Sequence, residues 1–162
     1  MSRVNDPRVQ MAYDAIVKHL ASQTEALTNL RNRATGLLGV SALVTSFSSV
    51  AGLVNADKAK GAILPTWAGW ALLGVLVGIG FLVMAALWPI RDWHYGPSAR
   101  IIMDRRNINA QEDDIRIHVI DELDAGRRSN KKMLEQRWMF FRLGASLLFG
   151  ELLILVAALA AR

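Results

Sequence analysis

The chain has 162 residues, of which 52% are hydrophobic and 20% charged, and its mean hydropathy is +0.25. This length fits one domain, whereas the hydrophobicity is too high for an ordinary soluble domain. Lys and Arg number 19 against 14 Asp and Glu, which suits either a nucleic-acid binder or a membrane protein with basic cytoplasmic segments. The absence of cysteine excludes disulfides, thiolate metal sites and thiol nucleophiles from this sequence.

Residues 1–33 predict a cytoplasmic N-terminal helix. Between Arg8 and Arg33 neither glycine nor proline interrupts the chain, so a helix can continue directly into the apolar segment that follows. Apolar residues recur in this region at roughly helical spacing, namely Met11, Ala15, Leu20, Leu27 and Leu30.

Three segments are long enough to cross a bilayer. Residues 34–54 and 66–90 contain no charged residue, and each reaches the ~20 residues that span a hydrocarbon core. Residues 138–161 reach the same length but contain Arg142 and Glu151. We therefore predict an all-α integral membrane protein with three transmembrane helices and cytoplasmic helical segments. The alternative is a soluble bundle of very apolar helices. Each helix of such a bundle needs a polar face, and the first two segments contain no charged residue that could form one.

The distribution of Lys and Arg predicts the orientation of these spans. Basic residues are dense in residues 1–33 and 91–137, whereas residues 55–65 contain only Lys58 and Lys60. We therefore expect the N-terminus and the 91–137 segment to face the cytoplasm, and residues 55–65 to form a short outer loop.

The cytoplasmic segment predicts a helix over residues 110–125. Asn109 is a candidate N-cap, and the acidic residues 112–114 suit the positive end of the helix dipole. The same three carboxylates form a poor set of metal ligands, because consecutive helical residues point in different directions. The apolar face of this helix repeats every four residues, at Ile115, Val119 and Leu123.

Gly126 is a candidate C′ residue, the glycine that commonly ends a helix. A second helix is expected to begin near Ser129. Because no breaker follows, this second helix should continue to Ala161 and combine a cytoplasmic stalk with the third span.

Sequence motifs of soluble enzymes are absent. The chain contains no glycine-rich phosphate loop and no HExxH, GxSxG or DxDxDG motif, and its three histidines are widely scattered. We therefore expect no enzymatic activity, no catalytic residue, no bound metal and no nucleic-acid partner.

Two stretches of the chain resemble the transmembrane effectors of the Pycsar antiphage system. Residues 26–40 (ALTNLRNRATGLLGV) are similar to the start of their first span, where a basic residue precedes Ala and a small, leucine-rich run. Residues 112–138 are similar to their acidic helix, their polar connector with Asn and their basic run into the last span. The order of two spans, a helical segment and a third span is also similar. The related SLATT-type effectors share a membrane hairpin with cytoplasmic helices.

This resemblance implies a signal-gated effector in the bacterial inner membrane. A partner cyclase makes cyclic UMP or cyclic CMP during infection, and the effector senses this diffusible nucleotide and impairs the membrane, which causes abortive infection. The implied partners are the cyclase, through its product, and membrane lipid. We also expect a homo-oligomer, because three short spans cannot enclose a path alone. No cofactor is implied besides the activating nucleotide.

Such an effector needs a site for a cyclic phosphate and a pyrimidine. Arginine forks bind phosphate, and aromatic faces stack on bases. The segment after the second span offers both groups, and its ordinary alternative role is an aromatic membrane belt with positive-inside anchors. The candidate nucleotide-binding residues are Trp93, Tyr95, Arg100, Arg105 and Arg106.

The effector also needs a polar feature inside the membrane, and Glu151 is the candidate. It lies about 20 Å into the third span, at 1.5 Å per residue. At the same depth, one face of the first span carries Ser41, Thr45 and Ser48. We expect a neutral acid that is hydrogen-bonded to this hydroxyl stripe, because an ionised carboxylate in hydrocarbon is costly. The second span contains a GxxxG motif at residues 74–78, which permits close helix packing.

Two other function classes remain open at this point. A non-enzymatic scaffold or accessory protein of a transfer or secretion complex would explain the basic cytoplasmic face and the short outer loop equally well. A subunit of an oligomeric ion pathway would explain the polar residues within the spans.

Overall fold

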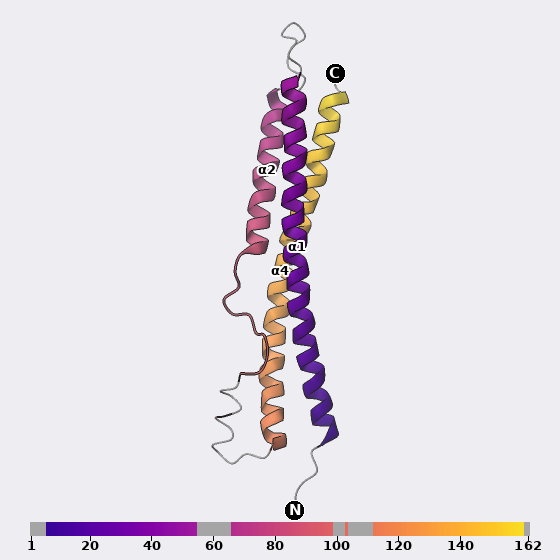
Figure 1. Cartoon of the computed structure of the whole chain (residues 1–162). Coiled ribbons are helices and arrows are strands. Elements are labelled where there is room, and N and C mark those ends of the chain that lie inside the picture. The colour runs from indigo at the N-terminus through magenta and orange to yellow at the C-terminus, as the bar shows by residue number, and fades with distance from the viewer. Residues whose placement is uncertain (1–5, 55–65, 99–102, 104–111, 161–162) are drawn as a thin grey trace, which may run out of the picture. The chain divides into compact units, whose positions relative to one another are not determined.

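The computed structural model describes residues 6–54, 66–98, 103 and 112–160. Within these residues the long helices are α1 (Pro7–Val54), α2 (Thr66–Leu87) and α4 (Glu112–Ala160) (Figure 1). No strand occurs in the described part of the chain, which agrees with the all-α prediction.

The chain forms two compact units instead of the one domain that its length suggests. Unit 1 comprises residues 1–28 and 89–135, and unit 2 comprises residues 29–88 and 136–162. Helices α1 and α4 therefore contribute residues to both units, whereas α2 belongs to unit 2 alone.

Helix α1 begins with an N-cap and a proline, two signals of a helix start. The side chain of Asp6 accepts a hydrogen bond from the backbone N–H of Arg8 at 2.9 Å. Pro7 occupies the first helical position, where its missing N–H costs nothing. The helix then continues without a break to Val54, so the predicted continuation from the N-terminal helix into the first apolar segment is confirmed.

Helix α2 ends at Leu87, three residues before the predicted end of the second span. The reason is Pro89, which disfavours helical geometry in the residue before it. Residues 88–90 therefore belong to the connection that follows α2.

Helix α4 is continuous, so the prediction that Gly126 ends a helix is wrong. The glycine serves close packing instead: a Cβ atom at position 126 would lie 2.9 Å from the Cβ and Cγ atoms of His94. The acidic residues 112–114 occupy the first turn of α4, as predicted. The candidate N-cap Asn109 lies outside the described residues.

Unit 1 has a small core between α1 and α4. Ile16 and Leu20 of α1 pack with Val119 and Leu123 of α4. The predicted apolar face is correct for Leu20, Val119 and Leu123, whereas Met11 and Ala15 are exposed because they lie off the buried stripe of α1.

In unit 2, α1, α2 and α4 lie side by side (Figure 1). Ala34 and Leu37 of α1 meet Ile79 and Val83 of α2 in the core. Aromatic and aliphatic residues of α4 pack against them. Gly144 of α4 permits this close approach, since a Cβ atom there would lie 3.1 Å from Cδ2 of Leu37.

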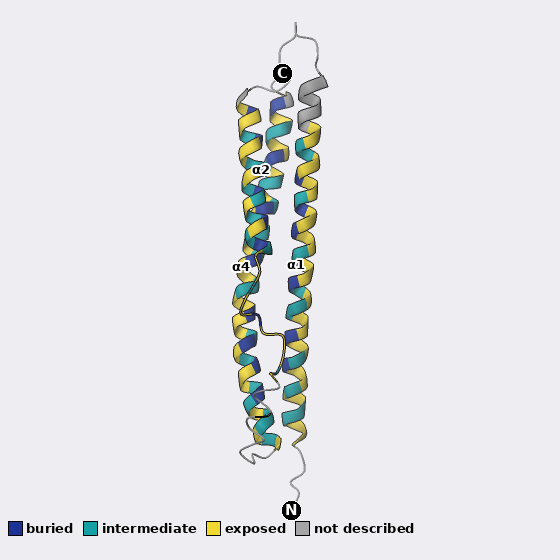
Figure 2. Ribbon diagram, turned by 60° about the vertical axis from the view of Figure 1, so that its left-hand side comes forward, coloured by how far each residue is buried: buried dark blue, intermediate teal, exposed yellow. Residues whose placement is uncertain are grey.

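Six buried residues of α4 recur at a spacing of seven, and we call these six positions the α4 heptad line. The line contains Leu123, Asn130, Arg137, Gly144, Glu151 and Ala158. Figure 2 shows buried residues recurring along the helix. In α1, the buried residues Leu20, Leu27, Ala34 and Ser41 have the same spacing. Such a repeat is typical of helices that pack as in a coiled coil.

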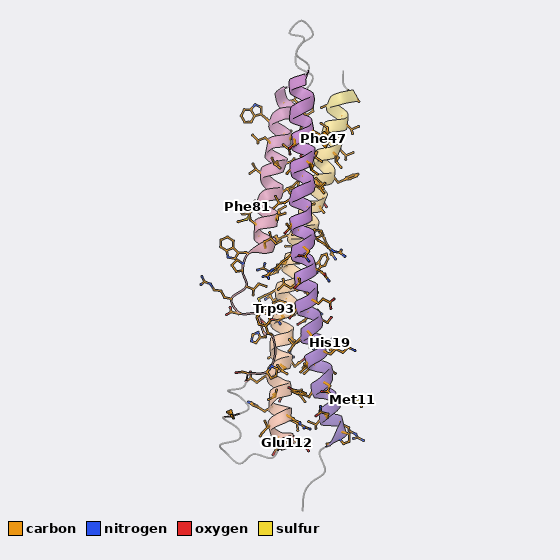
Figure 3. All side chains as sticks on the ribbon, viewed as in Figure 1. Met11, His19, Phe47, Phe81, Trp93 and Glu112 are labelled. Atoms are coloured by element: carbon orange, nitrogen blue, oxygen red, sulfur yellow. The ribbon has the colours of Figure 1, made fainter. Side chains whose placement is uncertain are left out.

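Two stretches of helix in the described residues are long and apolar enough to cross a membrane. They are Trp67–Leu87 in α2 and a stretch of α4. Only 22% and 11% of their most apolar parts are buried, so most of these side chains are at least partly exposed, Phe81 of α2 among them (Figure 3). Phe47 of α1 is exposed as well. The first predicted span, residues 34–54, is helical as part of α1, and its membrane crossing remains a prediction.

The unit 1 core yields the first prediction. Leu20→Ala removes a fully buried side chain and should lower the stability of unit 1 by about 2–5 kcal/mol. Met11→Ala, on the same helix but exposed, should change it by less than about 0.5 kcal/mol. Hydrogen exchange of the amides of residues 112–135 in the full-length chain measures both effects. Equal protection of these amides in the two variants would show that the cluster of Ile16, Leu20, Val119 and Leu123 does not stabilise unit 1.

Candidate functional site

Glu151 is the most deeply buried carboxylate in the described residues, with 1% of its surface exposed. Its Oε2 accepts a hydrogen bond from the hydroxyl of Ser41 at 3.2 Å, and its Oε1 lies 3.1 Å from the hydroxyl of Thr45. Ser41 is itself fully buried. The structure therefore brings together three of the four membrane-interior polar residues selected from the sequence. The side chain of the fourth, Ser48, lies outside the described part of α1.

The hydroxyl of Thr45 has two acceptors within reach. It lies 3.0 Å from the backbone carbonyl of Ser41 as well as 3.1 Å from Oε1 of Glu151. A hydroxyl has one proton to donate and can also accept. The single proton of Thr45 is therefore shared between the Ser41 carbonyl and the Glu151 carboxyl.

The GxxxG motif of α2 is used at one of its two glycines. A Cβ atom at Gly78 would lie 3.3 Å from Cδ1 of Leu147, whereas one at Gly74 would meet nothing within 4 Å. The motif thus permits the approach of a leucine side chain from α4.

In unit 1, the segment after α2 is held by three hydrogen bonds. The indole N–H of Trp93 donates to the hydroxyl of Thr24 at 3.3 Å. Asn130 accepts from the backbone N–H of His94 at 3.1 Å and donates to its carbonyl at 2.7 Å. The side chain of Asn130 is fully buried, so both of its hydrogen bonds serve to hold this backbone.

The five candidate nucleotide-binding residues differ in how the structure presents them. Trp93 is only 7% exposed, so it does not offer a free face for stacking. Tyr95 is 72% exposed and does offer one. Arg100, Arg105 and Arg106 lie outside the described residues.

Two basic residues at the middle of α4 share one carboxylate. Arg127 and Arg128 both contact the carboxylate of Asp124, at 2.8 and 2.9 Å. The hydrogen bond from Arg127 and the charges of both arginines hold the pKa of Asp124 below its usual value, against the opposing effect of burial. Each of these arginines therefore has a local ion-pair partner within α4.

A shallow groove of unit 1, about 480 Å³ in volume, lies between α1 and α4. Its polar lining is mixed in charge, because His19 and Arg127 face Asp121 and Asp124. The two carboxylates disfavour a phosphate there, so this groove is a weaker candidate for the nucleotide than the segment that contains Tyr95.

The acidic residues at the start of α4 do not converge on a common point. Glu112 pairs with Arg116 at 2.6 Å, and Asp113 accepts a hydrogen bond from the backbone N–H of Asp6. In the described part of the chain, no three His, Asp or Glu side chains are grouped as metal ligands.

Sequence reasoning missed two buried residues, Asn130 and Arg137. Both bond to backbone atoms, Asn130 to His94 and Arg137 to the carbonyl of Ala86. Because every residue has a backbone carbonyl, the sequence does not reveal which residue is the partner of Asn130 or Arg137. The available signal was the seven-residue spacing that these positions share with Glu151.

No protein-family model, curated protein or solved structure matches this chain.

The contact between Gly126 and His94 yields the second prediction. Gly126→Ala should destabilise unit 1 by about 1–3 kcal/mol, a typical cost of overpacking, because Asn130 holds the backbone of His94 and prevents it from moving away. Gly150→Ala, in the same helix but with nothing within 4 Å, should be neutral or stabilising by up to about 1 kcal/mol. Thermal unfolding by circular dichroism measures both. A stabilising Gly126→Ala would contradict the packing described here.

Proposed function

We propose that this chain is an integral protein of the bacterial inner membrane that impairs the membrane when its cytoplasmic segment binds cyclic UMP or cyclic CMP. The observation that carries the proposal is the buried Glu151, which bonds to hydroxyls of α1 within the largely apolar stretches of α1 and α4. In this proposal the N-terminus and the 91–137 segment lie in the cytoplasm, because basic residues are concentrated in them.

The outward faces of unit 2 support a location in lipid. Along α2 the exposed residues include Trp70, Val77 and Phe81, which a water-soluble protein would bury or cover. A soluble bundle places its apolar side chains inside, whereas only 22% of the most apolar part of α2 is buried. Lipid chains are the simplest cover for such a surface.

Glu151 supports a role beyond helix packing. A buried ionisable group within an apolar span is costly, and such groups are usually functional. In the proposed resting state, the acid is neutral and bonded to Ser41 and Thr45. In the proposed active state, rearrangement of α1 against α4 breaks these bonds and turns the carboxyl towards water that enters a homo-oligomer.

The nucleotide site in this proposal lies on the segment after α2. Tyr95 supplies an exposed aromatic face for the pyrimidine. Arg100, Arg105 and Arg106 supply guanidinium groups for the cyclic phosphate. Trp93 positions the segment through its contact with Thr24 and does not stack on the pyrimidine, so Tyr95 alone provides the stacking face in this proposal.

A route from the nucleotide to the membrane follows from chain connectivity. Helices α1 and α4 each contribute residues to both units. A ligand that changes how these helices pack in unit 1 therefore acts on the same two helices that hold Glu151.

Dye release from lipid vesicles tests this proposal. The full-length chain, reconstituted in vesicles, should release dye when cyclic UMP or cyclic CMP is added. Glu151→Gln keeps the hydrogen bonds but cannot ionise, and Glu151→Leu removes both properties, so both variants should lose release while retaining nucleotide binding. If Leu alone abolishes release, Glu151 acts by packing and hydrogen bonding only.

Variants of the hydroxyl groups sharpen this test. Ser41→Ala removes one hydrogen bond of the resting state, worth about 1 kcal/mol, and should lower the nucleotide concentration for half-maximal release by about fivefold. Ser46→Ala is the control, because its hydroxyl bonds only to the carbonyl of Ala42 in its own helix. Absence of release with either nucleotide from a correctly inserted chain would exclude the proposed effector function.

A further inference from the structure

Arg137 is a buried cation at the wall of a cavity in unit 2. Only 9% of its surface is exposed. The cavity has a volume of about 400 Å³, and its other walls are Phe81, Met84 and Ala85 of α2 and Trp88, the residue that follows α2. One charged side chain therefore borders an otherwise apolar space.

The guanidinium is fixed in place by the end of α2. One Nη1–H of Arg137 donates to the backbone carbonyl of Ala86 at 2.5 Å. Ala86 lies in the last turn of α2, where carbonyls have no partner within the helix and a positive charge is favoured. This bond uses one of five guanidinium donors and fixes the orientation of the others.

The charge of Arg137 has no counter-ion in the described part of the chain. Its hydrogen bond goes to a neutral carbonyl, and no carboxylate there forms an ion pair with it. The neighbouring cation Arg31 repels it instead. Buried charges in proteins are usually paired with an opposite charge. We therefore expect an anion from outside the chain to pair with this guanidinium.

The cavity is open on the side where the apolar residues of α2 face outward. Phe81, Met84 and Trp88 are all more than half exposed, and Figure 3 shows Phe81 projecting away from the other helices. Trp88 stands at the end of α2, a position typical of the membrane interface. An anionic ligand that fits these walls combines one phosphate with long hydrocarbon chains.

We propose that this cavity binds an anionic phospholipid, with its phosphate on Arg137 and an acyl chain along Phe81 and Met84. Guanidinium groups bind phosphate through two parallel hydrogen bonds, and basic pockets on the cytoplasmic side of membrane proteins bind anionic headgroups. The inference rests on the proposed membrane location of unit 2, but it does not depend on the nucleotide or on Glu151.

Lipid titration of the detergent-solubilised, full-length chain by native mass spectrometry tests this site. Dioleoylphosphatidylglycerol should bind about tenfold or more tightly than dioleoylphosphatidylcholine, because both lipids offer a phosphate but the choline cation offsets its charge beside the unpaired Arg137. Arg137→Gln keeps a donor for the Ala86 carbonyl and should abolish the preference. Arg142→Gln removes an exposed charge of the same helix and should preserve it.

A second variant separates the lipid site from the cap of α2. Ala85→Phe fills the cavity while leaving Arg137 in place, and it should weaken phosphatidylglycerol binding by about tenfold. Equal affinities of the parent chain for the two lipids would overturn the proposal. So would competition by the soluble headgroup glycerol phosphate at the affinity of the whole lipid, because the apolar walls would then contribute nothing.

Carbonate extraction of cell membranes distinguishes failure of this inference from failure of its premise. Release of the chain without detergent would overturn the membrane location together with the lipid site. An integral chain that shows no preference for phosphatidylglycerol would overturn the lipid site alone.

Discussion

The arrangement of the helices depends on the polar residues of the α4 heptad line. Asn130 bonds to the backbone of His94, Arg137 bonds to the last turn of α2, and Glu151 bonds to hydroxyls of α1. A shift of α4 by one residue would remove all three from their partners. Each buried polar group left without a partner costs about 1–3 kcal/mol, so these three contacts select one register among many apolar alternatives.

This register also decides which surfaces face outward. Because the α4 heptad line faces inward, residues such as Phe149, Leu153 and Val156 are exposed on the other sides of α4. The exposed residues of α2 have the same apolar character. Three polar side chains of unit 2, those of Ser41, Arg137 and Glu151, thus lie inside beside its apolar core, while much of its apolar surface lies outside, an arrangement suited to lipid.

The sequence predicted the continuous regular elements well, because their signals are local. The absence of breakers between Arg8 and Arg33 predicted the long α1, and acidic residues marked the first turn of α4. The meeting of Glu151 with Ser41 was also predictable, since two helices that run in the same direction place residues of equal depth side by side. The function implied by the resemblance stays a prediction.

The rest was hidden because its signals are not local. Gly126 has the residue type of a helix end, and only the approach of His94 from a distant segment explains it within a helix. Trp93 was a plausible stacking platform until its contact with Thr24 placed it inside unit 1. Asn130 and Arg137 interrupt the apolar pattern, so a search for apolar periodicity excludes the residues that fix the register.

The central claim, that lipid covers the apolar face of α2, is tested most directly by spin-label accessibility. Because the chain has no cysteine, Phe81→Cys and Met11→Cys each give a single labelling site. In vesicles, the label at position 81 should collide with oxygen and be protected from a water-soluble nickel chelate, whereas the label at position 11 should show the reverse. Collision of the label at position 81 with the nickel chelate, at the rate seen at position 11, would contradict the account.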